Sequence, residues 1–180
     1  PNSPVLDPAA TTGLTTAPRD VSWARFRGLA LPSSKAAGPF VVDGPVMRNY
    51  EHTPTGALIA ATQISARYLI TPDGGWREVL DKQVMPGPGR DTYTRLRAQL
   101  TDAAPTSGFA QFVGFRFITY TPDVAVISLA NRAATGATTV TTTTVHWSDG
   151  DWRVEIAPSG LAQPQAVTEL AGYVPWSGTS

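Results

Sequence analysis

The dipeptide Asp149-Gly150, which stands between two runs of alternating residues, constrains the fold of this chain more than any other feature. A type I′ turn needs positive φ at both central residues, and Asp-Gly is among the pairs that adopt it most readily. With these two residues in the turn, the register of the flanking strands follows, and Trp147 faces Trp152. The valines and tryptophans of "VHWSDGDWRVEI" then share one face, which a shifted register would not achieve. The stretch therefore predicts a β-hairpin.

The same stretch contains an imidazole, two carboxylates and two indoles within seven residues, a combination that also occurs in catalytic sites. The predicted register separates these groups, because His146 faces Arg153 on the polar side while both tryptophans lie on the apolar side. Asp149 belongs to the turn, and we expect Asp151, directly after it, to be solvated. We therefore predict no catalytic residue and no metal ligand here, but a polar outer face that serves for interaction. The residues of this predicted interaction face are Arg116, His146 and Arg153.

Helical segments precede this hairpin in the sequence. Thr53 suits an N-cap and Pro54 suits the first helical position, so "HTPTGALIAATQISARYLI" predicts a helix with one packed stripe. Shorter helices are predicted around residues 76–84 and 93–100, and a loop over residues 101–108. The apolar period then changes from 3.6 to 2, so "FAQFVGFRFITY" and "AVISLANRA" predict two strands before the hairpin.

This order of elements predicts an α+β fold. We expect two or three N-terminal helices packed on a curved four-stranded antiparallel sheet. Residues 21–45, interrupted by glycine and proline, predict an extended arm with one or two short strands before the helices. The Pro/Thr-rich residues 1–18 predict a flexible stalk or linker, and residues 19–180 a single α+β domain. Three residues of the tail are expected to dock on the domain: Tyr173, Val174 and Trp176.

Composition restricts the chemistry available to the chain. It contains no cysteine, which excludes disulfides and thiolate metal sites, and its two histidines, His52 and His146, do not predict a zinc site. Fourteen basic and fourteen acidic residues give a net charge of zero, which argues against direct binding of nucleic acid. No apolar run approaches the ~18 residues of a membrane-spanning helix, and no cofactor is expected. The chain begins with Pro1, so we expect that an N-terminal membrane anchor has been removed.

Four runs in this order, "HTPTGALIAA", "GFRFITYTPDVAVISL", "VHWSDGDWRVEI" and "LAGYVPW", resemble a family of largely uncharacterised actinobacterial proteins. Those proteins occur with integrative and conjugative elements and plasmid transfer genes. Their usual layout is one membrane helix, a Pro/Thr-rich stalk and a soluble domain outside the membrane. The order of helices and then sheet resembles the nuclear-transport-factor-two-like fold, as in the inner-membrane assembly factors of type IV secretion systems. The resemblance carries over no functional residues.

The resemblance implies a non-catalytic, extracytoplasmic scaffold or interaction domain of a conjugative DNA-transfer apparatus. The partners it implies are other proteins of the apparatus and further copies of the same chain. It also implies attachment to the membrane through an N-terminal helix that this chain does not contain.

Two alternatives stay open. A small-ligand or cell-wall-binding module would use the cone between helices and sheet, with the aromatic residues Trp76, Tyr93 and Phe117 as its lining. A cone-fold isomerase or hydrolase would need an acid–base pair in the same place. The candidates for that pair are Tyr68, Asp81, Tyr93 and Tyr120. The chain lacks the GxSxG, P-loop and dinucleotide-binding patterns.

Overall fold

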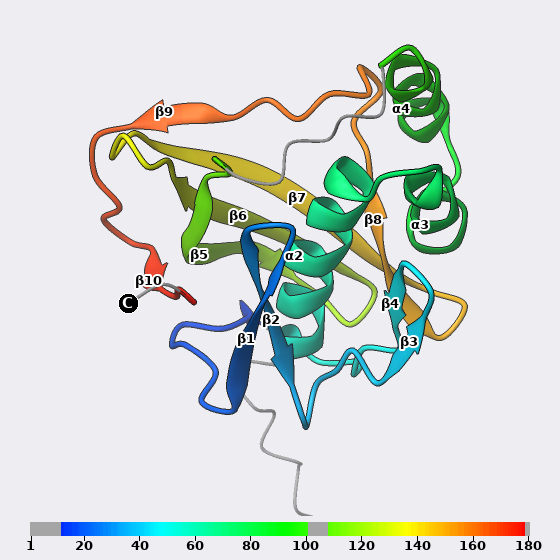
Figure 1. Cartoon of the computed structure of the whole chain (residues 1–180). Coiled ribbons are helices and arrows are strands. Elements are labelled where there is room, and N and C mark those ends of the chain that lie inside the picture. Colours follow the sequence, from blue (N-terminus) through cyan, green and yellow to red (C-terminus); the bar gives the residue numbers. More distant parts are fainter. Residues whose placement is uncertain (1–11, 101–107, 179–180) are drawn as a thin grey trace, which may run out of the picture.

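The computed structural model describes residues 12–100 and 108–178, and a six-stranded antiparallel sheet forms its largest element (Figure 1). The order along the sheet is β10-β5-β6-β7-β8, and β9 pairs with β7 as well. The strands are β5 (Gln111–Tyr120), β6 (Val124–Arg132), β7 (Thr138–Ser148), β8 (Asp151–Glu155), β9 (Gln165–Val167) and β10 (Val174–Pro175). Two register shifts interrupt the pairing of β5 with β6, so β5 is irregular along its length.

Two separate hairpins precede the helices. They consist of β1 (Val21–Phe26) with β2 (Leu29–Ser34), and of β3 (Val41–Asp43) with β4 (Val46–Arg48). The first hairpin turns at Arg27-Gly28, where φ is 50° and 90°, the left-handed backbone that glycine adopts without cost. The first of these hairpins crosses in front of the helical layer (Figure 1).

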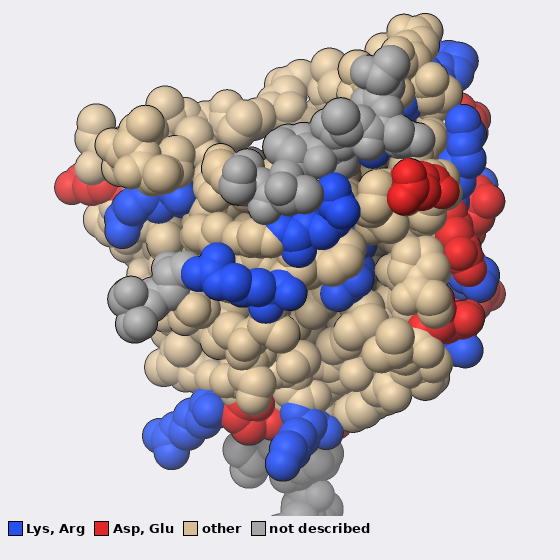
Figure 2. Space-filling view, in the orientation of Figure 1, with Lys and Arg blue, Asp and Glu red and all other residues tan. Residues whose placement is uncertain are grey.

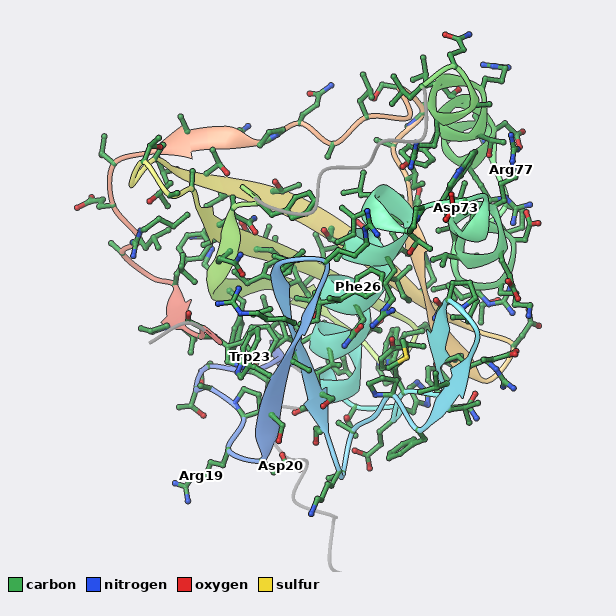
Figure 3. All side chains as sticks on the ribbon, in the orientation of Figure 1. Arg19, Asp20, Trp23, Phe26, Asp73 and Arg77 are labelled. Atoms are coloured by element: carbon green, nitrogen blue, oxygen red, sulfur yellow. The ribbon has the colours of Figure 1, made fainter. Side chains whose placement is uncertain are left out.

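Two aromatic residues of β1 fix the first hairpin on the domain (Figure 3). The ring of Trp23 packs edge-on against Trp176, with 4.7 Å between the ring centroids. The guanidinium of Arg67, on the following helix, lies 4.2 Å from the ring centroid of Phe26. The hairpin is therefore held both by the C-terminal tail and by a helix.

Three helices, α2 (Pro54–Ile70), α3 (Gly75–Gln83) and α4 (Pro88–Ala98), follow the hairpins. The predicted start of α2 is confirmed, because the Thr53 hydroxyl accepts a hydrogen bond of 3.1 Å from the backbone N–H of Gly56. Thirteen of its residues are buried, more than the predicted stripe, because β2 and α3 cover the sides that the main sheet leaves free. No helix in the described ranges is long and apolar enough to cross a membrane.

The predicted fold class is wrong. The described residues form ten strands and three helices, so the chain is mostly β and does not consist of helices on a four-stranded sheet. The expected nuclear-transport-factor-two-like arrangement is therefore not the one observed. In the arm, glycine and proline suggested breaks in an extended segment, yet Arg27-Gly28 and Gly44-Pro45 are turns that join paired strands.

The predicted hairpin of β7 and β8 is confirmed residue by residue. Trp147 pairs with Trp152 in the register that the turn required, and φ is 53° at Asp149 and 78° at Gly150. Trp152 is completely buried. The two strands expected before the hairpin are also present, as β5 and β6.

The C-terminal tail docks on the domain as predicted. Val174 pairs with Phe115 at the edge of the main sheet, and Trp176 is buried beside it. The hydroxyls of Tyr173 and Ser128 lie 2.7 Å apart, so the tail also crosses the face of the sheet that points away from α2. The tail thus adds to the sheet as well as covering part of it.

Parts of the predicted stalk and loop lie outside the described residues, namely residues 1–11 and 101–107. Residues 12–18, the part of the predicted stalk that the structure describes, pack on the domain. A Cβ atom on Gly13 would collide with the ring of Phe117, and Leu14 packs against the core.

Candidate functional site

A cavity of about 790 Å³ lies between the end of α2, one end of the main sheet and the segment that follows β8. Apolar side chains form much of its lining, among them Leu69 of α2, Phe112 of β5 and Ile156. Its polar lining includes Ser65, Asn131, Thr141, Thr142, Thr143, Gln163 and Gln165. Pockets that bind small molecules measure ~300–1,000 Å³ and combine an apolar lining with a few polar groups. This cavity is therefore the candidate functional site.

The cavity reaches a gap in the edge of the main sheet. One edge of β7 pairs with β6, and the other edge pairs with two strands in turn, β8 and β9. On that second edge, β8 ends opposite Thr144 and β9 begins opposite Val140. Between them, no described strand residue lies opposite Thr142. In a two-residue hairpin, the two residues that flank the turn exchange backbone hydrogen bonds, and here these are Ser148 and Asp151. The pattern repeats at every second residue, so the even-numbered residues of β7 direct their backbone N–H and C=O toward this edge. The backbone groups of Thr142 therefore face the gap.

The gap exists because the chain leaves the sheet after β8 and packs on α4. A Cβ atom on Gly89, at the start of α4, would collide with the carbonyl oxygens of Ile156 and Ala157. Farther on, Gly160 has a φ of 72° and lies against Thr92. These two glycines allow the chain to approach α4 closely before it returns to the sheet as β9 (Figure 1).

Large apolar side chains are exposed at this cavity. The exposed fractions are 46% for Leu69, 51% for Ile118 and 56% for Leu161, and all three residues line the cavity. They come from α2, from β5 and from the segment between β8 and β9. Single exposed apolar residues are ordinary, but apolar side chains that gather around one hollow mark a surface suited to binding.

A row of polar residues crosses the other face of the sheet within the same cavity. Arg116 on β5 pairs with Ser128 on β6, which pairs with Thr142 on β7. The Tyr173 ring lies over this row, with its centroid 5.1 Å from the Arg116 guanidinium. Its hydroxyl is 2.7 Å from that of Ser128. Lining residues thus come from both faces of the sheet, and the cavity spans the edge of β7.

The structure splits the predicted interaction face. His146 and Arg153 are cross-strand neighbours, and the His146 Nε2 lies 2.6 Å from a carboxylate oxygen of Glu155. Arg153 pairs with the turn residue Asp149 at 3.4 Å. Arg116 lies on the same face but two strands away, and His146 is four residues, or ~13 Å, beyond the row that contains Arg116. Of the three predicted residues, only Arg116 lines the cavity.

The candidate acid–base residues are only partly brought together. The Tyr93 hydroxyl donates a hydrogen bond of 2.9 Å to the Tyr68 carbonyl oxygen, and Tyr68 lines the cavity. Burial raises the pKa of Tyr93 to about 12, and burial, followed by the neighbouring Tyr93, raises the pKa of Tyr68 further. Both phenols are therefore neutral near pH 7. Asp81 is exposed on α3, and Tyr120 is buried near Trp152.

The aromatic residues expected to line a cone do not line the cavity. Trp76 packs edge-on against Tyr93 beneath two arginines, and Phe117 packs against Phe115. Sequence reasoning expected Tyr173 to dock on the domain but did not place it at a cavity, and it missed Leu161, whose surroundings carry no strand or helix period. Within residues 12–100 and 108–178, no group of three or more side chains is arranged to hold a metal ion.

A second surface with exposed apolar side chains lies on the β3–β4 hairpin. Phe40, just before β3, is 54% exposed, and Val42 is 68% exposed. The hairpin contains only two strands, so the outer edge of β3 is not covered by a further strand among the described residues. Neither residue lines the cavity.

Basic and acidic side chains occupy different parts of the face that Figure 2 shows. Figure 2 shows Lys and Arg side chains over the middle of one face and most Asp and Glu side chains along the margin near α3. Much of this face is uncharged, as expected for a chain in which only 16% of the residues are charged. On the face that Figure 2 shows, the described Lys and Arg side chains form no continuous basic stripe of the kind typical of nucleic-acid-binding surfaces.

No curated protein and no solved structure matches this chain. A family described as a domain of unknown function, DUF8175, matches residues 1–175. Because this match covers nearly the whole sequence, the chain belongs to the DUF8175 family.

Proposed function

We propose that this domain is a non-catalytic scaffold of a conjugative DNA-transfer apparatus, held on the extracytoplasmic side of the membrane. The resemblance of four sequence runs to proteins encoded with conjugative elements supports this assignment. The proposed partners are other proteins of the apparatus and further copies of the chain. The proposal includes attachment of the protein to the membrane and no direct contact with nucleic acid.

The structural observation that carries an interaction role is the apolar pair on the β3–β4 hairpin. Phe40 and Val42 are two residues apart, so their side chains project on the same side of an extended segment. Both are more than half exposed, and the adjacent strand edge offers unpaired backbone groups. An exposed apolar strand at a free edge suits pairing with another chain.

The test compares conjugative transfer in a deletion strain complemented with different variants. We expect the deletion to abolish transfer, and the double variant Phe40→Ser, Val42→Ser to restore it poorly. Leu96→Ser, which removes an apolar side chain that is 37% exposed on α4, should restore transfer fully. Normal transfer in the deletion strain would overturn the assignment. Full activity of the double variant would overturn the choice of surface.

Light scattering on the purified domain provides a second measurement. We expect the wild-type domain to form oligomers and the double hairpin variant to be monomeric at the same concentration. A wild-type domain that is monomeric at all concentrations would contradict self-association as part of the role.

Small-ligand binding is a second candidate function, and the cavity of about 790 Å³ favours it. Its volume lies in the range of known ligand pockets, and its lining combines apolar walls with a few polar groups. Saturable binding of a small molecule to the purified domain would support this function. The hairpin and the cavity share no residue, so the two candidate functions are tested by separate variants.

A further inference from the structure

The cavity contains a cation without a carboxylate partner. No Asp or Glu of the described chain lies within ion-pair distance of Arg116 in the salt bridges observed, and its guanidinium stacks on the ring of Tyr173. The lining includes one carboxylate, Glu155, and His146 engages it at 2.6 Å. The unbalanced charge in the described lining is therefore positive and is located at Arg116.

Hydroxyl groups beside Arg116 supply further hydrogen-bond donors. In the hydrogen bond between Ser128 and Tyr173, one hydroxyl proton is shared between the two oxygens, and the other remains free to donate. Thr142 follows Ser128 in the same cross-strand row and adds a hydroxyl, and its backbone N–H faces the gap beside β8. Neighbouring strands are ~4.8 Å apart, so one carboxylate can contact donors from two adjacent strands.

Other parts of the cavity lining carry exposed apolar side chains. Leu69, Ile118 and Leu161 are about half exposed, and each would lose water contact if a hydrocarbon chain lay between them. Burial of apolar surface favours binding. The cavity therefore combines exposed apolar side chains with one cation, Arg116, and hydroxyl donors beside it.

We infer that the cavity binds an aliphatic molecule that ends in a carboxylate, with Arg116 as the anchor for the carboxylate. The exposed leucine and isoleucine side chains contact the hydrocarbon chain, and the free hydroxyl of the Ser128–Tyr173 pair donates to the carboxylate beside Arg116. The positive charge of Arg116 would repel a cationic head group, and a neutral head group would form no ion pair with Arg116. This inference rests on ligand binding in the cavity, the second candidate function, and is independent of the scaffold role.

The test is calorimetric titration of the folded domain with dodecanoate below its micelle concentration. We expect saturable binding of one molecule per chain, and binding at least about tenfold weaker for hexanoate and for dodecyltrimethylammonium. Arg116→Met keeps the apolar stem and should weaken dodecanoate binding about tenfold. The matched control is Arg132→Met, because Arg132 is also exposed on the main sheet but does not line this cavity. It should bind like the wild type.

A second variant tests the apolar wall independently. Leu69→Glu places a negative charge beside the hydrocarbon chain and should abolish binding, while urea unfolding shows whether the variant remains folded. Absence of saturable dodecanoate binding to the wild-type domain would overturn the inference, as would equal affinity for the Arg116→Met variant. Either result would leave the transfer assay with the hairpin variants unaffected, so failure of this inference and failure of the scaffold role are distinguishable.

Discussion

The carboxylate of Asp151 accepts a hydrogen bond of 2.9 Å from the backbone N–H of Tyr50, a residue 101 positions earlier in the chain. The second carboxylate oxygen accepts one of 2.8 Å from the N–H of Asn49. The expectation that Asp151 is solvated is therefore wrong, because the turn of the last hairpin holds the segment that leads into α2. The Trp152 indole N–H strengthens this connection by donating to the carbonyl oxygen of Glu51 at 3.0 Å.

Replacement of Asp151 by alanine should lower the free energy of unfolding by about 1–3 kcal/mol, because two backbone N–H groups lose their acceptor. Urea unfolding followed by tryptophan fluorescence measures this change. Asp149→Asn is the control in the same turn, since asparagine also adopts positive φ, and it should change stability by less than about 0.5 kcal/mol. Equal effects of both substitutions would show that the Asp151 hydrogen bonds do not stabilise the fold.

Gly56→Ala in α2 should destabilise the protein by about 1–3 kcal/mol, although alanine is the better helix former by ~1 kcal/mol. A Cβ atom at this position would collide with the backbone carbonyl of Glu51, which cannot move aside as a flexible side chain could. Thermal unfolding measures the effect. Ser65→Ala on the same helix is the comparison and should change stability by no more than about 0.5 kcal/mol. An increase in melting temperature for Gly56→Ala would contradict the close approach.

The two histidines should differ in their effect on stability. The His52 ring stacks on Trp147 with 3.9 Å between centroids and an interplanar angle of 3°, and its Nε2 also contacts the Pro122 carbonyl oxygen. His52→Ala should therefore lower stability by about 1 kcal/mol and alter the near-UV circular dichroism of the tryptophans.

His146→Ala removes only a surface pair with Glu155 and should cost less than about 1 kcal/mol, without a change in the tryptophan signal. Urea unfolding and circular dichroism of both variants provide the comparison. A larger effect for His146 than for His52 would be inconsistent with the observed stacking.

The free energy of unfolding should fall as the pH rises from about 10 to about 12. Burial raises the pKa of Tyr93 to about 12, and burial also raises the pKa values of Tyr50 and Tyr68 above the ordinary phenol value. In this interval the unfolded chain has lost protons that the folded protein retains, so each buried phenol lowers stability by up to ~1.4 kcal/mol per pH unit.

Tyr93→Phe tests the origin of this alkaline slope. The variant should be less stable near pH 7, because the hydrogen bond to the Tyr68 carbonyl is lost, but its stability should fall less steeply above pH 10. Urea unfolding at several pH values separates the two effects. A slope equal to that of the wild type would exclude Tyr93 as a contributor.

Features that depend on a few consecutive residues could be predicted from the sequence. The register of β7 and β8 follows from the Asp149-Gly150 turn, and the start of α2 follows from Thr53 and Pro54. The arm was predicted wrongly because a turn such as Arg27-Gly28 and a break in an extended segment share the same residue types. Whether the strands on either side of such a residue pair depends on the side chains from other parts of the chain that pack on them. A local sequence pattern carries no information about those contacts.

The candidate site could be predicted only in part. Arg116 was expected on the polar face of the sheet, and it does lie there. Its position beside Ser128 depends on the register shifts in the pairing of β5 with β6, which no sequence period indicates. Leu161 and Tyr173 join the cavity because of where the tail runs after β8, and that path depends on the contact of Gly89 with the chain at Ile156.

The sequence by itself determined the turn between β7 and β8, the start of α2, the alternation of the central strands and the absence of thiol chemistry, because these follow from conformational preferences and composition over short stretches. Only the tertiary structure decided the mostly β architecture, the gap opposite Thr142 and the role of Asp151. The physical reason is that these features arise from contacts between distant residues, such as Asp151 with Tyr50. The free energy of such contacts depends on the packing of the whole domain rather than on the neighbouring residues in the chain.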